Sequence, residues 1–421
     1  MIRKYTTSVL AMIGAVATLS AAQTTRITVS NPLAFDRHDE IVEIPLDSLS
    51  PSSSQSFRIL GPDNREIGYQ ITYDRKVIFP ASVEASSSAT YTATPGQPTV
   101  GADTVSCGAL YKYRLDDIAW ENDKSGYRLY GPAIQQRGDK LYGYDIFTKR
   151  ATTSPVLRER YELECNQQIR DEINRLRKAG QTEKADSLYR IISYHIDSGT
   201  GMDVYTVGPT LGAGCSALMR DDLSLAYPYC YTDFEILDNG PYRFTVRLQF
   251  GPVDVDGDSV TETRLLSLDA GTHFNRCEIT YGGLTRTRPV ASGIVVHRQN
   301  PGGYRLDHDH GFVAYADSTD HADRDNGVIY ISVIAPDAPS ATIVQPMEPQ
   351  GDALGHVLTA TPCKPGSTYT YWWGSGWSKA GIESPDDWIE ITTRSAESLR
   401  HPLKATIQSN NPDSRQYRRQ H

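Results

Sequence analysis

The sequence has few of the features that would place it quickly in a functional class. Its 421 residues include six cysteines but no Cys-x-x-Cys pair, and no glycine-rich loop ends in the Gly-Lys-Ser/Thr of a phosphate-binding loop. Lys and Arg number 42 against 51 Asp and Glu, and the net charge of -9 argues against a general nucleic-acid-binding protein. Beyond the N-terminal segment, no apolar run approaches the roughly 20 residues of a membrane span.

The first 22 residues have the order of a secretory signal peptide. Arg3 and Lys4 precede an uncharged, mostly apolar run over residues 9–19, and small residues follow at 20–22. No cysteine follows the small residues, so we expect no lipid anchor. The sequence therefore predicts export to the periplasm and a mature chain that begins at about Gln23.

The cysteines are compatible with two interpretations. Export permits disulfides, and Cys215 and Cys230 are the closest pair and the first candidate for a bridge. The alternative is that most of the cysteines are small buried apolar residues, since a chain of this length needs no covalent staple. We favour the second interpretation.

Most of the chain has the hydrophobic pattern of β-strands. Residues 23–106 predict a small N-terminal β module and a Ser/Thr/Pro/Gly-rich linker. Residues 107–405 predict a large antiparallel β-sandwich, because stretches such as 242–250 alternate strictly between apolar and polar residues. Helical spacing over residues 155–194 predicts an inserted pair of helices. The polar tail over residues 406–421 is predicted to be disordered.

A glycine-rich loop after the helical segment holds the first candidate catalytic residues. His195, Asp203 and Tyr205 stand before and among five glycines. Histidine can act as a general base near neutral pH, and a neighbouring carboxylate can orient it. The alternative is a tight loop that needs glycine for its backbone angles.

Two predicted strands at residues 127–130 and 141–147 hold the second group. Arg128 and Tyr130 share a strand face, and arginine can bind a carboxylate in a bidentate pair. Asp145 shares a face with Lys149 in the second strand. The alternative is a surface ion pair flanked by core aromatics. The preceding segment adds three candidate binding residues, Trp120, Glu121 and Asn122.

The remaining candidate ligand-binding residues are aromatic or basic. Trp373 and Trp377 lie in an aromatic-rich segment, where flat rings could stack on sugars, although at least one aromatic of this strand is expected to pack in the core. Arg243 and Arg247 share the polar face of one strand and would suit an anionic ligand if that face lined a groove. Residues 254–258 predict a hairpin turn rather than a calcium loop. No cofactor motif is present.

The order of motifs from Trp120 through Arg128, Asp145, His195 and Asp203 to Gly212 resembles a family of exported Bacteroidota proteins. This family is known mostly as a domain of unknown function found near polysaccharide-utilisation genes, and the resemblance covers residues 120–388. The later segments are similar to the galactose-mutarotase-like supersandwich of sugar epimerases and of domains in polysaccharide lyases. The base expected there from aldose epimerases is replaced by Ser367, so simple mutarotase activity is not implied.

Together these observations predict a carbohydrate-active enzyme that acts on acidic oligosaccharides by elimination, as a lyase or dehydratase. His195 or Tyr130 would take the proton, Arg128 or Lys149 would neutralise the substrate carboxylate, and Asp145 and Asp203 would orient the pair. A glycoside hydrolase and a non-catalytic glycan-binding protein remain alternatives. The sequence does not identify the sugar or the oligomeric state.

Overall fold

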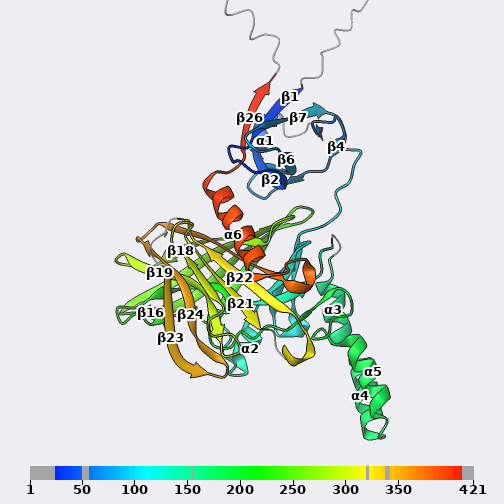
Figure 1. Ribbon diagram of the computed structural model, residues 1–421, viewed down its shortest axis with the longest axis vertical. Coiled ribbons are helices and arrows are strands. Elements are labelled where there is room, and N and C mark those ends of the chain that lie inside the picture. Colours follow the sequence, from blue (N-terminus) through cyan, green and yellow to red (C-terminus); the bar gives the residue numbers. More distant parts are fainter. Residues whose placement is uncertain (1–23, 50–55, 153–154, 319–321, 337–341, 410–421) are drawn as a thin grey trace, which may run out of the picture.

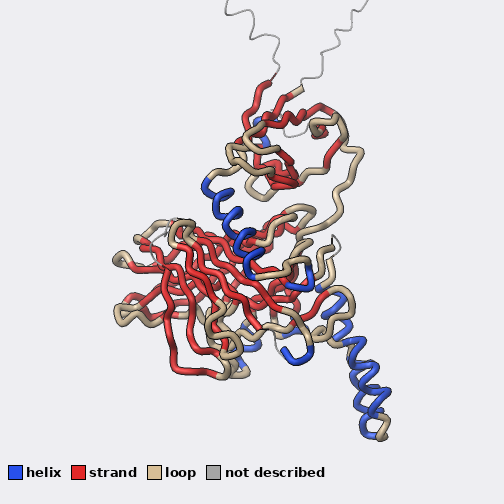
Figure 2. The backbone as a smooth tube through the Cα atoms, viewed as in Figure 1, coloured by secondary structure: helices blue, strands red, loops and turns tan. Residues whose placement is uncertain are grey.

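The computed structural model describes residues 24–49, 56–152, 155–318, 322–336 and 342–409, and the N-terminal segment predicted as a signal peptide lies outside them (Figure 1). Most of its regular structure is β, as Figure 2 shows. The prediction of a mainly β protein with a large antiparallel sandwich is therefore confirmed. No helix in these ranges is long and apolar enough to cross a membrane.

The N-terminal module consists of two small sheets that enclose their own apolar core. One sheet has the order β26-β1-β7-β3-β4 and the other β2-β6-β5, with a short helix α1 (Leu46–Leu49) beside them. Their strands are β1 (Thr25–Ser30), β2 (Arg37–Pro45), β3 (Phe57–Leu60), β4 (Glu66–Ile67), β5 (Gln70–Ile71), β6 (Lys76–Val83) and β7 (Ser88–Pro95).

The last strand of this module comes from the other end of the chain. β26 (Lys404–Ser409) pairs antiparallel with β1, from Thr25 opposite Ser409 to Ser30 opposite Lys404. The predicted boundary of a disordered tail at residue 406 is therefore wrong, because residues 406–409 gain backbone hydrogen bonds from a distant strand. Residues 410–421 lie outside the described residues.

The sandwich has an eight-stranded sheet as one layer and two five-stranded sheets as the other. The eight strands, in spatial order, are β15 (Tyr231–Asn239), β16 (Arg243–Val255), β17 (Asp258–Asp269), β18 (Phe274–Gly282), β25 (Thr368–Trp377), β22 (Val328–Ile334), β21 (Phe312–Ser318) and β20 (Tyr304–Asp307). Alternation in β16 buries Phe244, Val246, Leu248 and Phe250, as predicted. The hairpin turn predicted between β16 and β17 is also confirmed.

The opposite layer is formed by a central sheet and a lateral sheet. The central sheet has the order β14 (Leu225–Ala226), β13 (Ala213–Met219), β19 (Arg288–His297), β24 (Ala353–Cys363) and β23 (Thr342–Gln350). The lateral sheet has the order β12 (Gly201–Asp203), β11 (Tyr144–Lys149), β10 (Ser125–Leu129), β9 (Asp117–Glu121) and β8 (Cys107–Tyr111). A parallel bridge between Tyr144 and Gly212 joins the two sheets.

The helical insertion contains three helices, where two were predicted. α3 (Leu157–Glu164) packs on the lateral sheet, while α4 (Gln167–Lys178) and α5 (Thr182–Ile192) form an arm that projects from the sandwich (Figure 1). The chain breaks after α3 because the Asn166 side chain accepts a hydrogen bond from the Ile169 amide and starts α4. A short helix α2 (Pro132–Gln136) follows β10.

A sixth helix, α6 (Pro385–Arg400), covers the outer face of the eight-stranded sheet and connects the sandwich to β26 (Figure 1). Trp388 and Ala396 of this helix are buried against the sheet. This helix was not expected from the sequence.

All six cysteines are free, so the candidate Cys215–Cys230 bridge is wrong. Cys215 is buried on β13 near the Arg264 guanidinium, whereas Cys230 lies in the loop before β15. Burial raises the pKa of Cys277 to about 12, so this thiol stays protonated. Cys215, Cys277 and Cys363 are buried, whereas Cys107, Cys165 and Cys230 are partly buried, so the favoured interpretation holds for half of the cysteines.

Candidate functional site

The outer face of the lateral sheet carries a buried arginine surrounded by carboxylates. Alternation along β10 directs Tyr127 and Leu129 into the sandwich core and Arg128 to the opposite face. Arg128 stands directly across from Asp145 of β11, and its Nε lies 3.1 Å from Asp145 Oδ2. Its Nη2 contacts Asp145 as well and lies 2.9 Å from Asp203 Oδ2 on β12.

A second arginine and a third carboxylate complete this cluster, and the sequence analysis missed both. Asp117 Oδ2 on β9 lies 3.8 Å from Arg128 Nε and 3.9 Å from Arg114 Nε. The Arg114 guanidinium also lies 4.3 Å from the ring centres of Tyr161 and Tyr194. We call Arg114, Asp117, Arg128, Asp145 and Asp203 the Arg128 cluster. Its formal charge is negative, with three carboxylates against two guanidiniums.

Two carboxyl groups of this cluster have raised pKa values and therefore keep their protons to a higher pH than usual. Burial raises the pKa of Asp203 to about 6, aided by repulsion from Asp145 and opposed by Arg128. Burial likewise raises the pKa of Asp117 to about 6, against the attraction of Arg128 and Arg114. The cluster can therefore hold a proton on a carboxyl group up to about pH 6.

Tyr130 contacts the Arg128 cluster but is not suited to the predicted role of base. Its hydroxyl donates to Asp145, and burial raises the Tyr130 pKa well above 10. A phenol this hard to ionise stays a hydrogen-bond donor. The structure thus brings Arg128, Tyr130, Asp145 and Asp203 together as a connected group.

His195 adjoins the cluster on the solvent side. Its Nδ1 lies 2.7 Å from the backbone oxygen of Asp203, and its ring packs 4.1 Å from that of Tyr194. A carbonyl oxygen can only accept, so Nδ1 carries the hydrogen and Nε2 of the neutral ring is left as an acceptor. His195 is exposed, and no described residue forms a hydrogen bond with its Nε2.

Tyr205 lies beyond the cluster, near a buried histidine–aspartate pair that the sequence analysis also missed. Its ring centre is 5.9 Å from that of His297, and His297 Nδ1 lies 2.9 Å from Asp317 Oδ2. The Tyr205 hydroxyl is buried and has no hydrogen-bond partner among the described residues. No local pattern could have revealed this pair, because β19 and β21 supply its members from opposite layers.

Three predicted ligand-binding residues have structural roles instead. Lys149 is fully buried, and its Nζ lies 2.7 Å from Glu121 Oε2. Glu121 also accepts hydrogen bonds from the backbone amides of Val156 and Leu157 at the start of α3. Asn122 is equally buried and donates to the backbone oxygen of Asp269. The predicted binding roles of Glu121, Asn122 and Lys149 are therefore wrong, because these side chains are buried and form hydrogen bonds within the protein.

The predicted aromatic platform is part of the core. Trp120 and Trp373 are 0% exposed and Trp377 is 2% exposed. Trp373 stacks on Tyr144 with ring centres 4.1 Å apart, and Trp120 donates to Asn275 at 2.7 Å. Sugar stacking needs an open ring face, so this prediction is corrected for Trp120, Trp373 and Trp377.

The two strand arginines do not line a common groove. Arg243 forms ion pairs with Asp269 and with Glu43 of the N-terminal module, at 2.5 and 2.6 Å, and so joins the two parts of the protein. Arg247 forms an exposed pair with Glu235 at 2.6 Å. Neither guanidinium is left for an anionic ligand. In the described residues, no group of three or more His, Cys, Asp or Glu side chains is placed to hold a metal.

The raised pKa values predict a specific pH dependence of stability. The unfolded chain releases the Asp203 proton near pH 4, whereas the folded protein keeps it to about pH 6. The folded state binds more protons in this window, so the contribution of Asp203 to stability falls as the pH rises from about 4 to 6. We expect Asp203→Asn, which keeps a neutral side chain, to gain about 2–3 kcal/mol relative to wild type across this window.

Urea denaturation at several pH values measures this difference. Asp139→Asn, at an exposed position, is the matched control and should follow the wild-type curve at every pH. A constant offset between Asp203→Asn and wild type from pH 4 to 7 would contradict the raised pKa.

Comparison with known proteins places the chain among uncharacterised relatives. Uncharacterized protein P7 of Formosa agariphila is 25% identical over 303 residues, which are 70% of this chain and 68% of that protein. A glycosyl hydrolase family 38 protein and an alpha-mannosidase, both from Enterococcus faecalis, match over 92% of this chain with a TM-score of 0.46 and 8% identity. This chain spans less than half of either structure, 48% and 46%, and so distant a likeness supports no conclusion about activity. The family model described as Domain of unknown function (DUF4861) matches residues 29–405, so this chain belongs to that family.

Proposed function

We propose that this protein is a carbohydrate-active enzyme that cleaves acidic oligosaccharides by elimination, with His195 as the base. The observation that carries this proposal is the anchored imidazole of His195, whose Nδ1 is 2.7 Å from the Asp203 carbonyl oxygen while Nε2 remains an acceptor on an exposed ring. An oriented imidazole with an open nitrogen is suited to take a proton from a substrate carbon. The carbohydrate class is supported by the resemblance of the motif order to exported proteins encoded near polysaccharide-utilisation genes.

The proposed reaction breaks a carbon–hydrogen bond beside the substrate carboxylate. His195 Nε2 takes the proton, the electron pair forms a carbon–carbon double bond, and the bond to the leaving oxygen breaks. Asp203, whose pKa is about 6, supplies a proton to that oxygen. Arg128 is already paired with Asp145 and Asp203, so its role is to balance charge around the acid rather than to grip the substrate carboxylate.

The predicted signal peptide bears on the size of the substrate. We propose that the protein acts in the periplasm, where oligosaccharides arrive after uptake across the outer membrane. We therefore propose short uronate-containing chains, rather than intact polymers, as substrates.

Hydrolysis is the second candidate, and one observation favours it. Asp145 and Asp203 contact the same Arg128 nitrogen, and the Asp203 pKa is raised, so a proton-carrying carboxyl lies beside a second carboxylate. Glycoside hydrolases use such a pair across the scissile bond. A product without a double bond would select hydrolysis over elimination. Binding of acidic glycans without turnover would select the glycan-binding alternative.

Replacement of His195 by alanine tests the proposal. We expect the turnover of uronate oligosaccharides to fall at least about 100-fold, because the proton-abstracting group is lost. Absorbance of the unsaturated product measures the rate, and the fall should appear in kcat more than in KM. Unfolding should change little, since the imidazole is exposed.

His38→Ala removes another exposed histidine, on β2 of the N-terminal module, and is the matched control. Its turnover should equal that of the wild type. Full activity of His195→Ala would eliminate His195 as the base and with it the proposed mechanism.

A further inference from the structure

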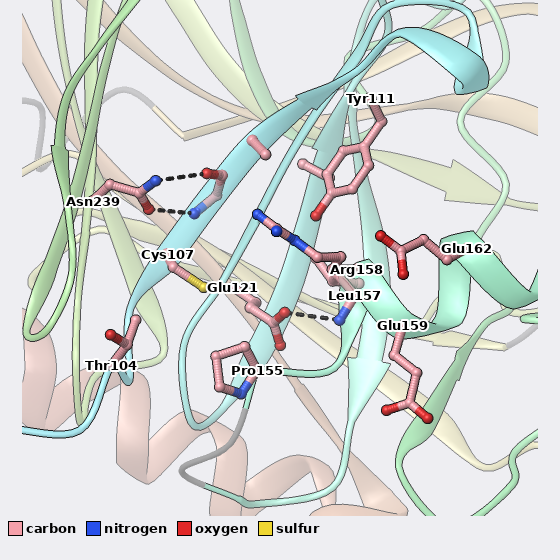
Figure 3. A pocket seen from close by; sticks show the side chains of 13 residues that line it. Thr104, Cys107, Tyr111, Glu121, Pro155, Leu157, Arg158, Glu159, Glu162 and Asn239 are labelled. Carbon is pink, nitrogen blue, oxygen red and sulfur yellow. Dashed lines mark hydrogen bonds between the residues drawn. The ribbon is translucent and has the colours of Figure 1, made fainter.

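A cavity of about 430 Å³ lies between α3 and the edge strand β8 (Figure 3). β8 forms one edge of the lateral sheet and β12, which carries Asp203, forms the other, so the cavity lies at the opposite edge from Asp203. Its lining residue Tyr111 pairs with Asp117, the member of the Arg128 cluster on β9. Ala109, Ala119, Pro155 and Leu157 provide apolar lining. The groups that can form polar contacts are Thr104, Cys107, Tyr111, Arg158, Glu159 and Glu162.

The wall formed by β8 is held in place by Asn239, which also lines the cavity. The Asn239 amide accepts a hydrogen bond from the Gly108 amide at 3.0 Å and donates to the Gly108 carbonyl at 3.1 Å (Figure 3). This side chain thus occupies part of the open edge of β8. On the opposite wall, Glu121 holds the Leu157 amide at the start of α3. The cavity is therefore bounded by fixed backbone on both sides.

Several polar groups that line the cavity have no hydrogen-bond or ion-pair partner among the residues that the structure describes. Tyr111 is only 6% exposed, and its hydroxyl forms no hydrogen bond with any described residue. Figure 3 shows this hydroxyl directed into the space between the lining residues. Among the described residues, Arg158, Glu159 and Glu162 also form no ion pair or side-chain hydrogen bond. The Tyr111 hydroxyl is not among the buried side-chain atoms that lack a partner, so it is open to the cavity, and a ligand hydroxyl can take the place of water on it.

The charged and hydrogen-bonding side chains that line the cavity indicate which kind of ligand it can bind. Glu159 and Glu162 can only accept hydrogen bonds, the Tyr111 hydroxyl can do either, and Arg158 is the one cation among the lining residues named. Two uncommitted carboxylates against one guanidinium repel an anion. The volume falls in the usual range for a small-molecule site, about 300–1,000 Å³. The lining therefore suits a small, uncharged ligand rich in hydroxyl groups.

We propose that this cavity binds an uncharged sugar unit. The assignment to carbohydrate rests on the proposed function, whereas the preference for an uncharged unit rests on the lining itself. Tyr111 and Thr104 bond the sugar hydroxyls, Glu159 and Glu162 accept from them, and the apolar wall contacts the ring carbons. Such a site would hold a neutral residue of a mixed oligosaccharide away from the centre that processes the uronate. Burial raises the pKa of Cys107 to about 11, so its thiol stays neutral and adds no charge.

Calorimetric titration of the full-length protein with glucose, galactose, rhamnose, xylose and glucuronate tests this proposal. We expect at least one neutral sugar to bind and glucuronate to bind at least tenfold more weakly. Tyr111→Phe removes only the hydroxyl and should weaken binding of that sugar at least fivefold, while Ala109→Phe should abolish it by filling the cavity. Tyr113→Phe is the matched control, because Tyr113 is an exposed tyrosine two residues away that does not line the cavity.

Absence of neutral-sugar binding, equal binding of glucuronate, or unchanged affinity in Tyr111→Phe would each overturn the proposal. Thermal unfolding of each variant shows whether lost binding reflects lost structure, and Tyr111→Phe is conservative enough to fold. The result of the sugar-binding experiment can be distinguished from the result of the His195 activity experiment. His195→Ala should lose the double-bond chemistry and keep neutral-sugar binding.

Discussion

Replacement of Arg128 by alanine should destabilise the protein by about 3–5 kcal/mol, the largest effect that we expect from a change at the candidate site. The guanidinium lies between Asp117, Asp145 and Asp203, at strand positions from which water is nearly excluded. Without it, three buried carboxylates face one another with only Arg114 nearby. Equilibrium urea denaturation at pH 7.5, above the raised pKa values, would measure the loss.

Arg247→Ala provides the matched control for Arg128→Ala. It also removes an arginine paired with a carboxylate, Glu235 at 2.6 Å, but on an exposed surface. We expect a loss below about 1 kcal/mol. Arg128→Lys keeps the charge without the fork-shaped contacts, and we expect it to fold with an intermediate loss. Equal stability losses for Arg128→Ala and Arg247→Ala would contradict the assignment of Arg128 as the charge-balancing centre of a buried cluster.

Strand periodicity explains why part of this cluster could be predicted. Side chains alternate along a strand, so the apolar neighbours of Arg128 and Asp145 predict that both point away from the core. The pairing of β10 with β11 places Arg128 directly opposite Asp145. This placement depends on the register of the two strands, which side-chain alternation does not predict. Asp117 was missed because it follows a second aspartate at the start of a strand and reads as part of a turn. Arg114 was missed because it reaches the cluster from a short 3-10 helix outside the lateral sheet.

The same distinction between local and long-range information holds for the fold. Long alternating strands such as β16 are visible in the sequence because their pattern is local. The pairing of β26 with β1 joins segments nearly 380 residues apart, and no local pattern encodes it. α6 did have a local signal, since Ser384 and Asp387 form a capping box at its N-terminus. Its apolar stripe went unrecognised because it is interrupted by charged and hydroxyl side chains.

Aromatic composition was the least reliable guide to function in this sequence. A cluster of tryptophans fits a sugar-binding platform and a core equally well until the two faces of the strand are known. In β25, Tyr371 and Trp373 point into the sandwich, whereas Trp372 points toward α6 on the other side. Position along the strand, rather than residue type, therefore decides whether a tryptophan packs in the sandwich core or on the outer face of the sheet.

This assignment leads to the expectation that Trp373→Ala costs about 3–5 kcal/mol of folding stability. The ring is fully buried, stacks on Tyr144 at an interplanar angle of 3°, and packs so closely on Gly214 that a Cβ added there would lie 2.7 Å from the Trp373 Cβ. Its removal leaves a large cavity between the two layers. Denaturant titration measures the loss, and calorimetry at a temperature where the variant remains folded measures glycan binding.

Trp372→Ala separates the structural role from a binding role at the adjacent position. This ring is only partly buried, against the cluster beneath α6, so we expect a smaller loss of about 1–2 kcal/mol. Neither variant should change the affinity for oligosaccharides once it is folded, because neither ring lines the cavity beside β8. If Trp373→Ala instead kept wild-type stability and lost oligosaccharide binding, the aromatic segment would be a binding platform, and its burial between the layers would have to open when the ligand arrives.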